Sequence, residues 1–441
     1  MLAPLLTALL ALPAPPQDIP TAAGRHFRVR CHGFASAEFA DDALSAVEAL
    51  WPHAAELYGL PKKSLKKRLE VNLYRRESDY QRVNQELTSG EFTKNLAFAH
   101  FDTRSAHVAL QPPCSDELLA EFGVPAQTLR LLVHEAAHLV RYEAHNNFRS
   151  HPDWVAHGAA SWIDQMVMEE VGRSSPLADP WSSKTVLRVQ TLLEEERLPG
   201  AAAIFRGELQ ELEFYDRYSV TEVFFRYLRS NKDVQLKGML QALRRLAGGG
   251  DFNERYYAEV DALLGKSWEQ ELDAGFEKYL RELEPEWDHV LRSLSPQVDG
   301  YLQVAFPETN SVAFRRTGVG GGDFRLSGRL RILPARASQM NLLLGRRERG
   351  FVSVAINAGY GLTVFDYDGA LWNRIGDVKV EGIGVGEQLT FQAQLTGDTL
   401  VLTINETEAL RIDAGQLDLS GAWGLGAQAG SAGLWQDLAV D

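Results

Sequence analysis

The sequence predicts an α+β domain followed by an all-β sandwich. Two observations lead to this fold class. Between residues 24 and 295, short segments of strand-like alternation are followed by long amphipathic helical patterns, whereas from residue 297 onwards glycine and two-residue alternation replace the helical periodicity. The chain of 441 residues is too long for one ordinary domain, and its 45% hydrophobic content is ample for two packed cores.

The N-terminal segment, residues 1–17, is typical of an export signal. Its apolar run is too short to span a bilayer and ends in small residues and proline, with cleavage expected near Ala14. A buried N-terminal helix is the alternative, but the Pro-Ala-Pro-Pro end disfavours packing into a domain. No later segment reaches eighteen apolar residues. We therefore expect a secreted or periplasmic protein without a membrane span.

The first part of the α+β domain alternates strands with helices. His26–Gly33 and Arg68–Arg75 have the pattern of strands, and Leu96–Leu110 that of a hairpin or a bent strand. Ser36–Tyr58 has apolar residues at helical spacing, and Pro52 predicts a kink or a break within it. The remainder of the domain is predicted to be helical. The amphipathic patterns cover Thr185–Arg197, Tyr218–Arg229, Leu236–Ala247 and Trp268–Leu283.

The segment Leu131–Val140, LLVHEAAHLV, carries the pattern H-E-x-x-H as His134, Glu135 and His138. Two histidines four residues apart on a helix share one face, so both rings can reach one ion. Zinc suits such a pair best, and Glu135 would lie where it can take a proton from water bound by the metal. The alternative is a core helix with partly buried histidines, but polar groups in such an apolar helix need a partner, which a metal supplies.

The third ligand has to come from elsewhere in the chain. The metzincin pattern is disfavoured, because it needs a glycine at position 141 and a histidine at 144, and the chain has Arg141 and Ala144. The segment Pro152–Asp164, PDWVAHGAASWID, resembles the P-x-W-L-x-E-G-x-A-E-Y box of bacterial peptidase-MA-like proteins. His157 stands where the ligand glutamate of that box is expected, nineteen positions after His138.

These two motifs make residues 24–295 similar to the gluzincin metallopeptidases, the thermolysin-like group of zinc enzymes. The resemblance implies a zincin-like catalytic domain in which His134, His138 and His157 hold zinc. It also implies that Glu135 is first the general base and then the acid. The histidine in place of the ligand glutamate departs from the family, although three histidines and a water are a known catalytic set. The alternative is that His157 is an ordinary helix residue in a protein that has lost its metal.

Three further features bear on the resemblance, and the first is a second departure from the family. The family carries a carboxylate four residues after the third ligand, where this chain has Ser161; Asp164, seven residues after it, can take over the orientation of a zinc histidine. The family's edge strand implies that Ala97–Phe101 lines the cleft, while His100 and His107 are expected to be strand-face residues. Phe214–Leu228 resembles the family's tyrosine-containing helix. Its candidates for binding the oxyanion are Tyr218 and Tyr215, and aromatic core packing is the alternative for both.

The all-β part is predicted from its alternation. Phe324–Ile332 alternates apolar with polar side chains, and Leu389–Leu395 and Leu400–Ile404 flank a Thr-Gly-Asp turn, as in a hairpin. The closing segment, residues 424–440, is similar to the last strands of concanavalin A-like jelly rolls, which often bind glycans. Four aromatic residues are candidates for stacking on a sugar ring, with core packing as the alternative. They are Tyr360, Trp372, Trp423 and Trp435.

Charge and cysteine content limit the partners. A formal charge of −14 and a pI near 5.4 give no reason to expect nucleic acid or anionic membranes as partners. Cys31 and Cys114 could form a disulfide in an oxidising compartment, but the sequence does not set the distance between them.

Taken together, these patterns predict a secreted zinc metallopeptidase with a C-terminal binding domain. The alternative is a non-catalytic glycan- or surface-binding protein with a degenerate metal domain. The sequence leaves endo- and exopeptidase activity open.

Overall fold

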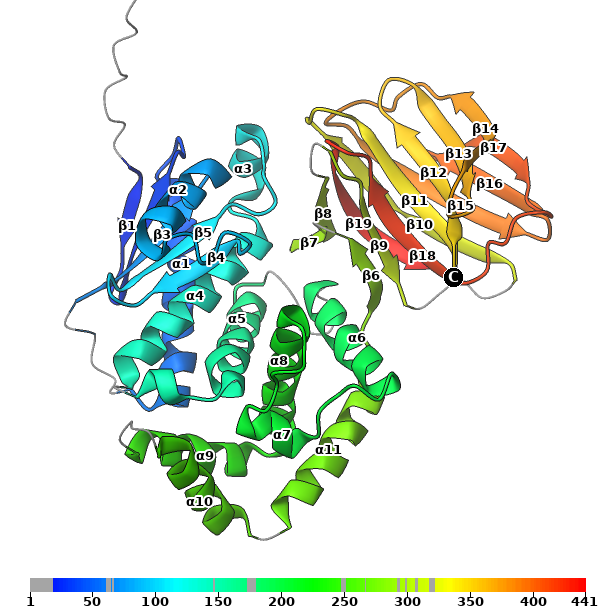
Figure 1. Cartoon of the computed structure of the whole chain (residues 1–441). Helices are drawn as coiled ribbons and strands as arrows, with labels where there is room; N and C mark the ends of the chain where they lie inside the picture. The colour runs from blue at the N-terminus through cyan, green and yellow to red at the C-terminus, as the bar shows by residue number, and fades with distance from the viewer. Residues whose placement is uncertain are drawn as a thin grey trace, which may run out of the picture.

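The computed structural model describes residues 19–60, 65, 67–145, 147–172, 180–246, 251–265, 267–291, 294–297, 300–305, 308–316 and 322–441. The expected export signal, residues 1–17, lies outside these ranges. An α+β part and an all-β part follow each other along the chain, as predicted (Figure 1).

A five-stranded sheet forms one layer of the α+β part. Its strand order is β1 (Thr21–Ala23), β2 (Phe27–His32), β3 (Leu69–Tyr74), β5 (Ser105–Ala109) and β4 (Ala97–His100). The three central strands are parallel, whereas β1 and β4 run antiparallel at the two edges. The predicted strands and the predicted hairpin are therefore confirmed.

Helices pack on this sheet and on one another. The first helices are α1 (Glu38–Tyr58), α2 (Glu77–Thr88), α3 (Asp116–Phe122), α4 (Ala126–Ala144) and α5 (Ala159–Glu170), with the short turns η1 (Phe148–Ser150) and η2 (Trp154–Gly158) between the last two. Helix α1 is a single assigned helix that contains Pro52, so the predicted break does not occur. Buried side chains on both sides of the proline, Leu50 and Ala54 among them, pack into one core and offset the lost backbone hydrogen bond.

A second group of helices completes the α+β part. These are α6 (Pro180–Glu194), α7 (Ala201–Arg206), α8 (Phe214–Asn231), α9 (Asp233–Arg245), α10 (Phe252–Leu264) and α11 (Trp268–Glu282). The four predicted helical segments match α6, α8, α9 and α11. Helix α10 lies in the region predicted to be helical but was not among the four named segments, although its buried residues Phe252, Tyr256 and Val260 have helical spacing.

The C-terminal part is a sandwich of two antiparallel seven-stranded sheets. Its strands are β6 (Trp287–Leu291), β7 (Leu294–Gln297), β8 (Gly300–Val304), β9 (Ser311–Arg315), β10 (Phe324–Leu333), β11 (Gln339–Arg347), β12 (Gly350–Asn357), β13 (Gly361–Tyr367), β14 (Trp372–Lys379), β15 (Gln388–Thr396), β16 (Thr399–Ile404), β17 (Thr407–Asp413), β18 (Ala422–Ala427) and β19 (Ala432–Val440). One sheet has the order β17-β16-β15-β10-β19-β8-β7 and the other β14-β13-β12-β11-β18-β9-β6. The alternating apolar residues of β10, β15 and β16 are buried between the sheets, which confirms the predicted strand and hairpin.

The sandwich begins earlier in the chain than expected. Strand β6 starts at Trp287 and pairs with β9, and β7 pairs with β8. The predicted boundary near residue 296 is therefore wrong. The fully buried Trp287 belongs to the core between the two sheets, and only this pairing distinguishes the segment from a continuing helix.

The two parts of the chain are in direct contact. Leu118 of α3 packs with Leu302, Leu333 and Leu434 of the sandwich, and Glu121 forms an ion pair with Arg331. On another side, the Ser183 hydroxyl of α6 accepts a hydrogen bond from the backbone N–H of Trp287 at 3.2 Å. These contacts join the sandwich to α3 and α6 of the α+β part.

Neither cysteine is paired in the structure: Cys31 is buried and Cys114 is half-buried. Among the described residues, every helix is too short or too polar to cross a membrane.

Candidate metal centre

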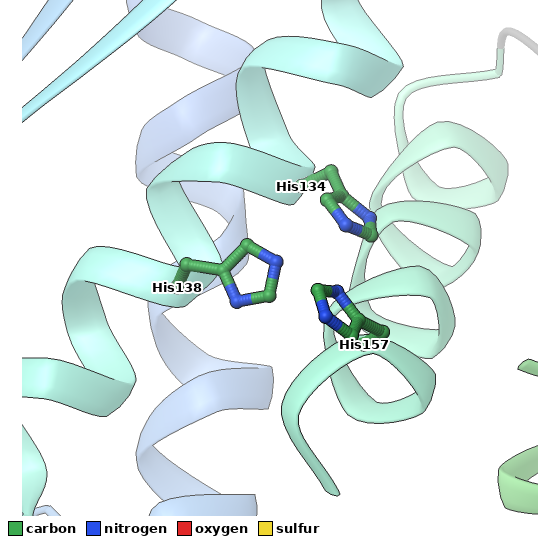
Figure 2. A group of neighbouring side chains, drawn as sticks. All are labelled: His134, His138 and His157. Carbon is green, nitrogen blue, oxygen red and sulfur yellow. The ribbon is translucent and has the colours of Figure 1, made fainter. Parts of the chain in front are cut away.

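Three histidines from two neighbouring elements meet in one place. His134 and His138 lie on α4, and His157 extends toward them from η2, at the start of the next helical segment (Figure 2). One nitrogen of each ring lies within 4.8 Å of the others. The ring centroid of His138 lies 4.9 Å from that of His134 and 5.1 Å from that of His157. The three predicted ligands are therefore close enough to share one ion.

The turn that carries His157 is a π-helix, Trp154–Gly158, held by its neighbours on both sides. The indole N–H of the fully buried Trp154 donates a hydrogen bond to the Phe205 carbonyl at 2.9 Å. At Gly158, an added Cβ would lie 2.4 Å from the Thr221 carbonyl oxygen of α8. The absence of a side chain at this position lets η2 approach α8 closely, which fixes where His157 points. Such single π-turns are frequent at functional sites.

Asp164 of α5 orients the first histidine. Its Oδ2 lies 3.0 Å from Nδ1 of His134, so the ring can donate that N–H and keep Nε2 for a metal. This is the role predicted for Asp164 in place of Ser161. The guanidinium of Arg130 donates from Nε to the other carboxylate oxygen of Asp164 at 2.8 Å. Arg130 was not singled out in the sequence, although it stands one helical turn before His134 in the same apolar helix.

Glu135 lies between the histidines and the edge strand. Burial raises the pKa of its carboxyl to about 7, against the opposing effects of His134 and a hydrogen bond from the backbone N–H of Ala99. Ala99 belongs to β4, so this edge strand adjoins the site as the resemblance implied. The side chains of Ala97 and Phe98 are buried, and Phe101 packs on Tyr142 and Phe148. The strand therefore meets the site through its backbone rather than through these side chains.

The other histidines of the strands are not part of the cluster. His107 is buried and hydrogen-bonded to the Tyr74 and Ser105 hydroxyls, and His100 lies 2.8 Å from Thr103 Oγ1. This agrees with the prediction that both are strand-face residues.

The two tyrosine candidates occupy different places. The Tyr218 ring of α8 lies 4.3 Å from the His157 ring, and burial, reinforced by the Glu135 carboxylate, raises the Tyr218 pKa. Tyr215 is 59% exposed and lies against the Arg188 guanidinium. Of the two, only Tyr218 contacts a residue of the histidine cluster.

The donor set fits zinc. Burial lowers the pKa of His138 well below its usual value and that of His157 to about 3, so both rings are neutral, the form that binds a metal. Nδ1 of His157 is buried and has no hydrogen-bond partner among the described residues. An unsatisfied buried nitrogen is costly, and coordination in this cluster would satisfy a ring nitrogen of each histidine.

The aromatic candidates of the sandwich divide into two pairs. Trp423 and Trp435 are buried in the core between the sheets, so for these two candidates the alternative of core packing holds. Trp372 is 51% exposed, and Tyr360 is exposed as well. The Trp372 ring stacks on Tyr367 at 4.6 Å and meets Phe351 edge-on at 5.8 Å. The exposed Trp372 ring is thus held in place by its contacts with Tyr367 and Phe351.

Comparisons with known proteins give partial matches to solved structures only. No family model matches the chain, and no curated protein matches it. Among solved structures, the carbohydrate binding module CBM66 from Bacillus subtilis matches 35% of this chain over 95% of its own length, with 14% identity and a TM-score of 0.31. The VIP36 exoplasmic/lumenal domain in a Ca2+/Man3GlcNAc-bound form matches 36% of this chain over 84% of its own, with 8% identity and a TM-score of 0.31. The carbohydrate recognition domain of Emp46p matches 36% over 89%, with 10% identity and a TM-score of 0.29.

Proposed function

We propose that this protein is a zinc-dependent peptidase in which His134, His138 and His157 hold the metal. The observation that carries the proposal is the meeting of three histidine nitrogens within 4.8 Å, from two elements, next to Glu135. Zinc held there would supply a Lewis acid that polarises the scissile carbonyl and makes a nearby water more acidic. The chain's own residues would do the remaining work.

Glu135 is the proposed proton carrier. It takes a proton from the water that attacks the peptide carbonyl and returns it to the amine nitrogen as the C–N bond breaks. The Ala99 N–H holds the Glu135 carboxylate beside β4. Among the described strands, β4 is an outer strand of its sheet, where an extended peptide can pair by strand addition. Tyr218 is the proposed donor to the oxyanion that forms on the carbonyl.

The test combines zinc content with hydrolysis of unfolded protein. We expect the wild type to purify with one zinc and to lose activity on chelation. Glu135→Gln should keep the zinc and lose activity by roughly 10²-fold or more. Glu143→Gln is the matched control, because Glu143 lies on the same helix but pairs with Arg104. A wild type without zinc, or an active Glu135→Gln variant, would overturn the proposal.

Glycan binding by the sandwich is a second candidate function. It is favoured by the exposed Trp372 ring stacked on Tyr367, since a sugar ring can lie on such a surface. Two of the named neighbours are a carbohydrate binding module and a carbohydrate recognition domain. Trp372→Ala should abolish retention on a polysaccharide column, and Leu371→Ala, at the neighbouring exposed residue, should not. Zinc binding with no hydrolysis of any peptide pool would leave this candidate as the main function.

We also propose export from the cytoplasm, on the apolar segment at residues 1–17. Sequencing the N-terminus of the mature protein would test it, and an intact Met1 after expression in a secreting host would contradict it.

A further inference from the structure

A buried network of five polar side chains lies behind the histidine cluster. Its members come from three helices: Arg130 from α4, Asp164 and Gln165 from α5, and Glu222 and Arg226 from α8. Each is at most 9% exposed. A buried ionic network is weak evidence for added stability, because apolar residues of the same volume often serve as well. Its arrangement therefore calls for a second reason.

Arg130 lies between two carboxylates of this network. Its Nε donates to Asp164 Oδ1 at 2.8 Å, and its Nη2 lies 3.5 Å from Glu222 Oε1. The second oxygen of Asp164 lies 3.0 Å from Nδ1 of His134. One planar guanidinium therefore fixes the carboxylate that orients a proposed metal ligand.

Glu222 extends the network to α8, the helix that carries Tyr218. Its Oε1 accepts a hydrogen bond from Gln165 Nε2 at 2.7 Å and one from Arg226 at 3.2 Å. Glu222 stands one helical turn after Tyr218 on α8, so the two side chains lie on one face of that helix. The network thus joins the helix of His134 to the helix of Tyr218.

We propose that Arg130 is a positioning residue of the metal centre. It holds Asp164 so that the His134 ring keeps the orientation that offers Nε2, and through Glu222 it holds α8 and Tyr218 beside His157. The inference rests on the proposed metal site, but not on the reaction performed there. A residue that acts only on overall stability would lack any selective effect on zinc affinity.

The first test compares two buried arginines. Arg130→Met removes the charge and keeps the aliphatic stem, whereas Arg226→Met is the matched control. Arg226 is as buried as Arg130 and also contacts Glu222, but among the described residues it has no contact with Asp164. Zinc affinity, measured in the full chain by competition with a chelator, should fall about 10- to 100-fold for Arg130→Met. It should change less than about threefold for Arg226→Met, given intact circular dichroism for both.

A double-mutant cycle then asks whether Arg130 acts through Asp164. Asp164→Asn should weaken zinc binding by itself, and adding Arg130→Met to it should cause a smaller loss than Arg130→Met causes in the wild type. Arg130→Lys should give a smaller loss than Arg130→Met, because the ammonium group keeps the positive charge. Some loss should remain, because an ammonium group cannot hold both carboxylates as a planar fork does. This variant keeps the test open if Arg130→Met fails to fold.

The outcomes separate the inference from the function. Zinc binding by the wild type with equal affinities for Arg130→Met and Arg226→Met, or additive losses in the cycle, would overturn the positioning role and leave the peptidase proposal standing. A wild type that binds zinc but hydrolyses nothing would overturn the peptidase and leave the affinity comparison valid. A wild type that binds no zinc would overturn both.

Discussion

The substitution Gly158→Ala tests how the third histidine is placed. The added Cβ would lie 2.4 Å from the Thr221 carbonyl oxygen and 2.7 Å from Phe225 Cβ, and both atoms belong to α8 near its backbone. Ordinary contacts begin at 3.4 Å, so the carbonyl contact is short by 3.4 − 2.4 = 1.0 Å. Because neither neighbour can rotate away, η2 and α8 have to separate.

The cost follows from two opposing terms. Overpacking of a well-packed interface costs about 1–3 kcal/mol, while alanine in place of glycine in a helix gains up to about 1 kcal/mol. The net loss of about 1–2 kcal/mol should lower Tm by roughly 2–8 °C in a domain of this size. His157 precedes Gly158 directly, and metal ligands tolerate displacements of only about 0.2 Å. Zinc affinity should therefore fall by about 10-fold or more.

Thermal unfolding and chelator competition measure the two effects. Gly238→Ala in α9 is the matched control, because its Cβ would also meet an atom at 2.4 Å. That atom is the tip of the Leu263 side chain, which is 53% exposed and can move away. The control should keep its Tm and its zinc affinity. Unchanged zinc affinity in Gly158→Ala, or equal losses in the two variants, would refute the packing argument.

Three further outcomes are expected. His157→Glu should retain zinc, because a carboxylate also serves as a ligand; loss of the metal in a zinc assay would count against the geometry of η2. Burial lowers the pKa of His107 to about 3, below its unfolded value near 6.5, so its contribution to stability is lost as pH falls. Between pH 7 and pH 5 this residue should lower the free energy of unfolding of the wild type by about 2 kcal/mol. In urea titrations, the free energy of unfolding of His107→Gln should fall by about 2 kcal/mol less over the same pH range. At the contact between the two parts, Leu118→Ala should lower the free energy of unfolding by about 2–3 kcal/mol, because it removes buried apolar surface. Glu121→Ala should lower it by less than about 1 kcal/mol, because it removes a surface ion pair. Equal shifts in melting for these two variants would show that the apolar contact does not dominate the interface.

Much of the fold could be predicted from local patterns. Two-residue alternation identified β10, β15 and β16, and helical spacing identified α1 and α8. The boundary between the two parts could not be placed in this way. The segment from Trp287 follows a long helix and carries no clear alternation, and its pairing partner β9 lies more than twenty residues further along the chain.

The roles of the tryptophans show the same limit. Trp372 and Trp435 both lie on strands, and an aromatic residue on a strand can face either side of a sheet. Sheet pairing put Trp435 in the core and left Trp372 at the surface. Likewise, the sequence named Asp164 as a partner of the metal histidine, but Arg130 became visible only when α4 and α5 were packed together.

By itself, the sequence determined that His134 and His138 share a helical face and that Glu135 follows His134 directly, because residue spacing within one helix fixes their relative direction. Only the tertiary structure decided that His157 faces the same point. That direction depends on Trp154 bound to Phe205 and on Gly158 pressed against α8, contacts between residues far apart in the chain that no local spacing encodes.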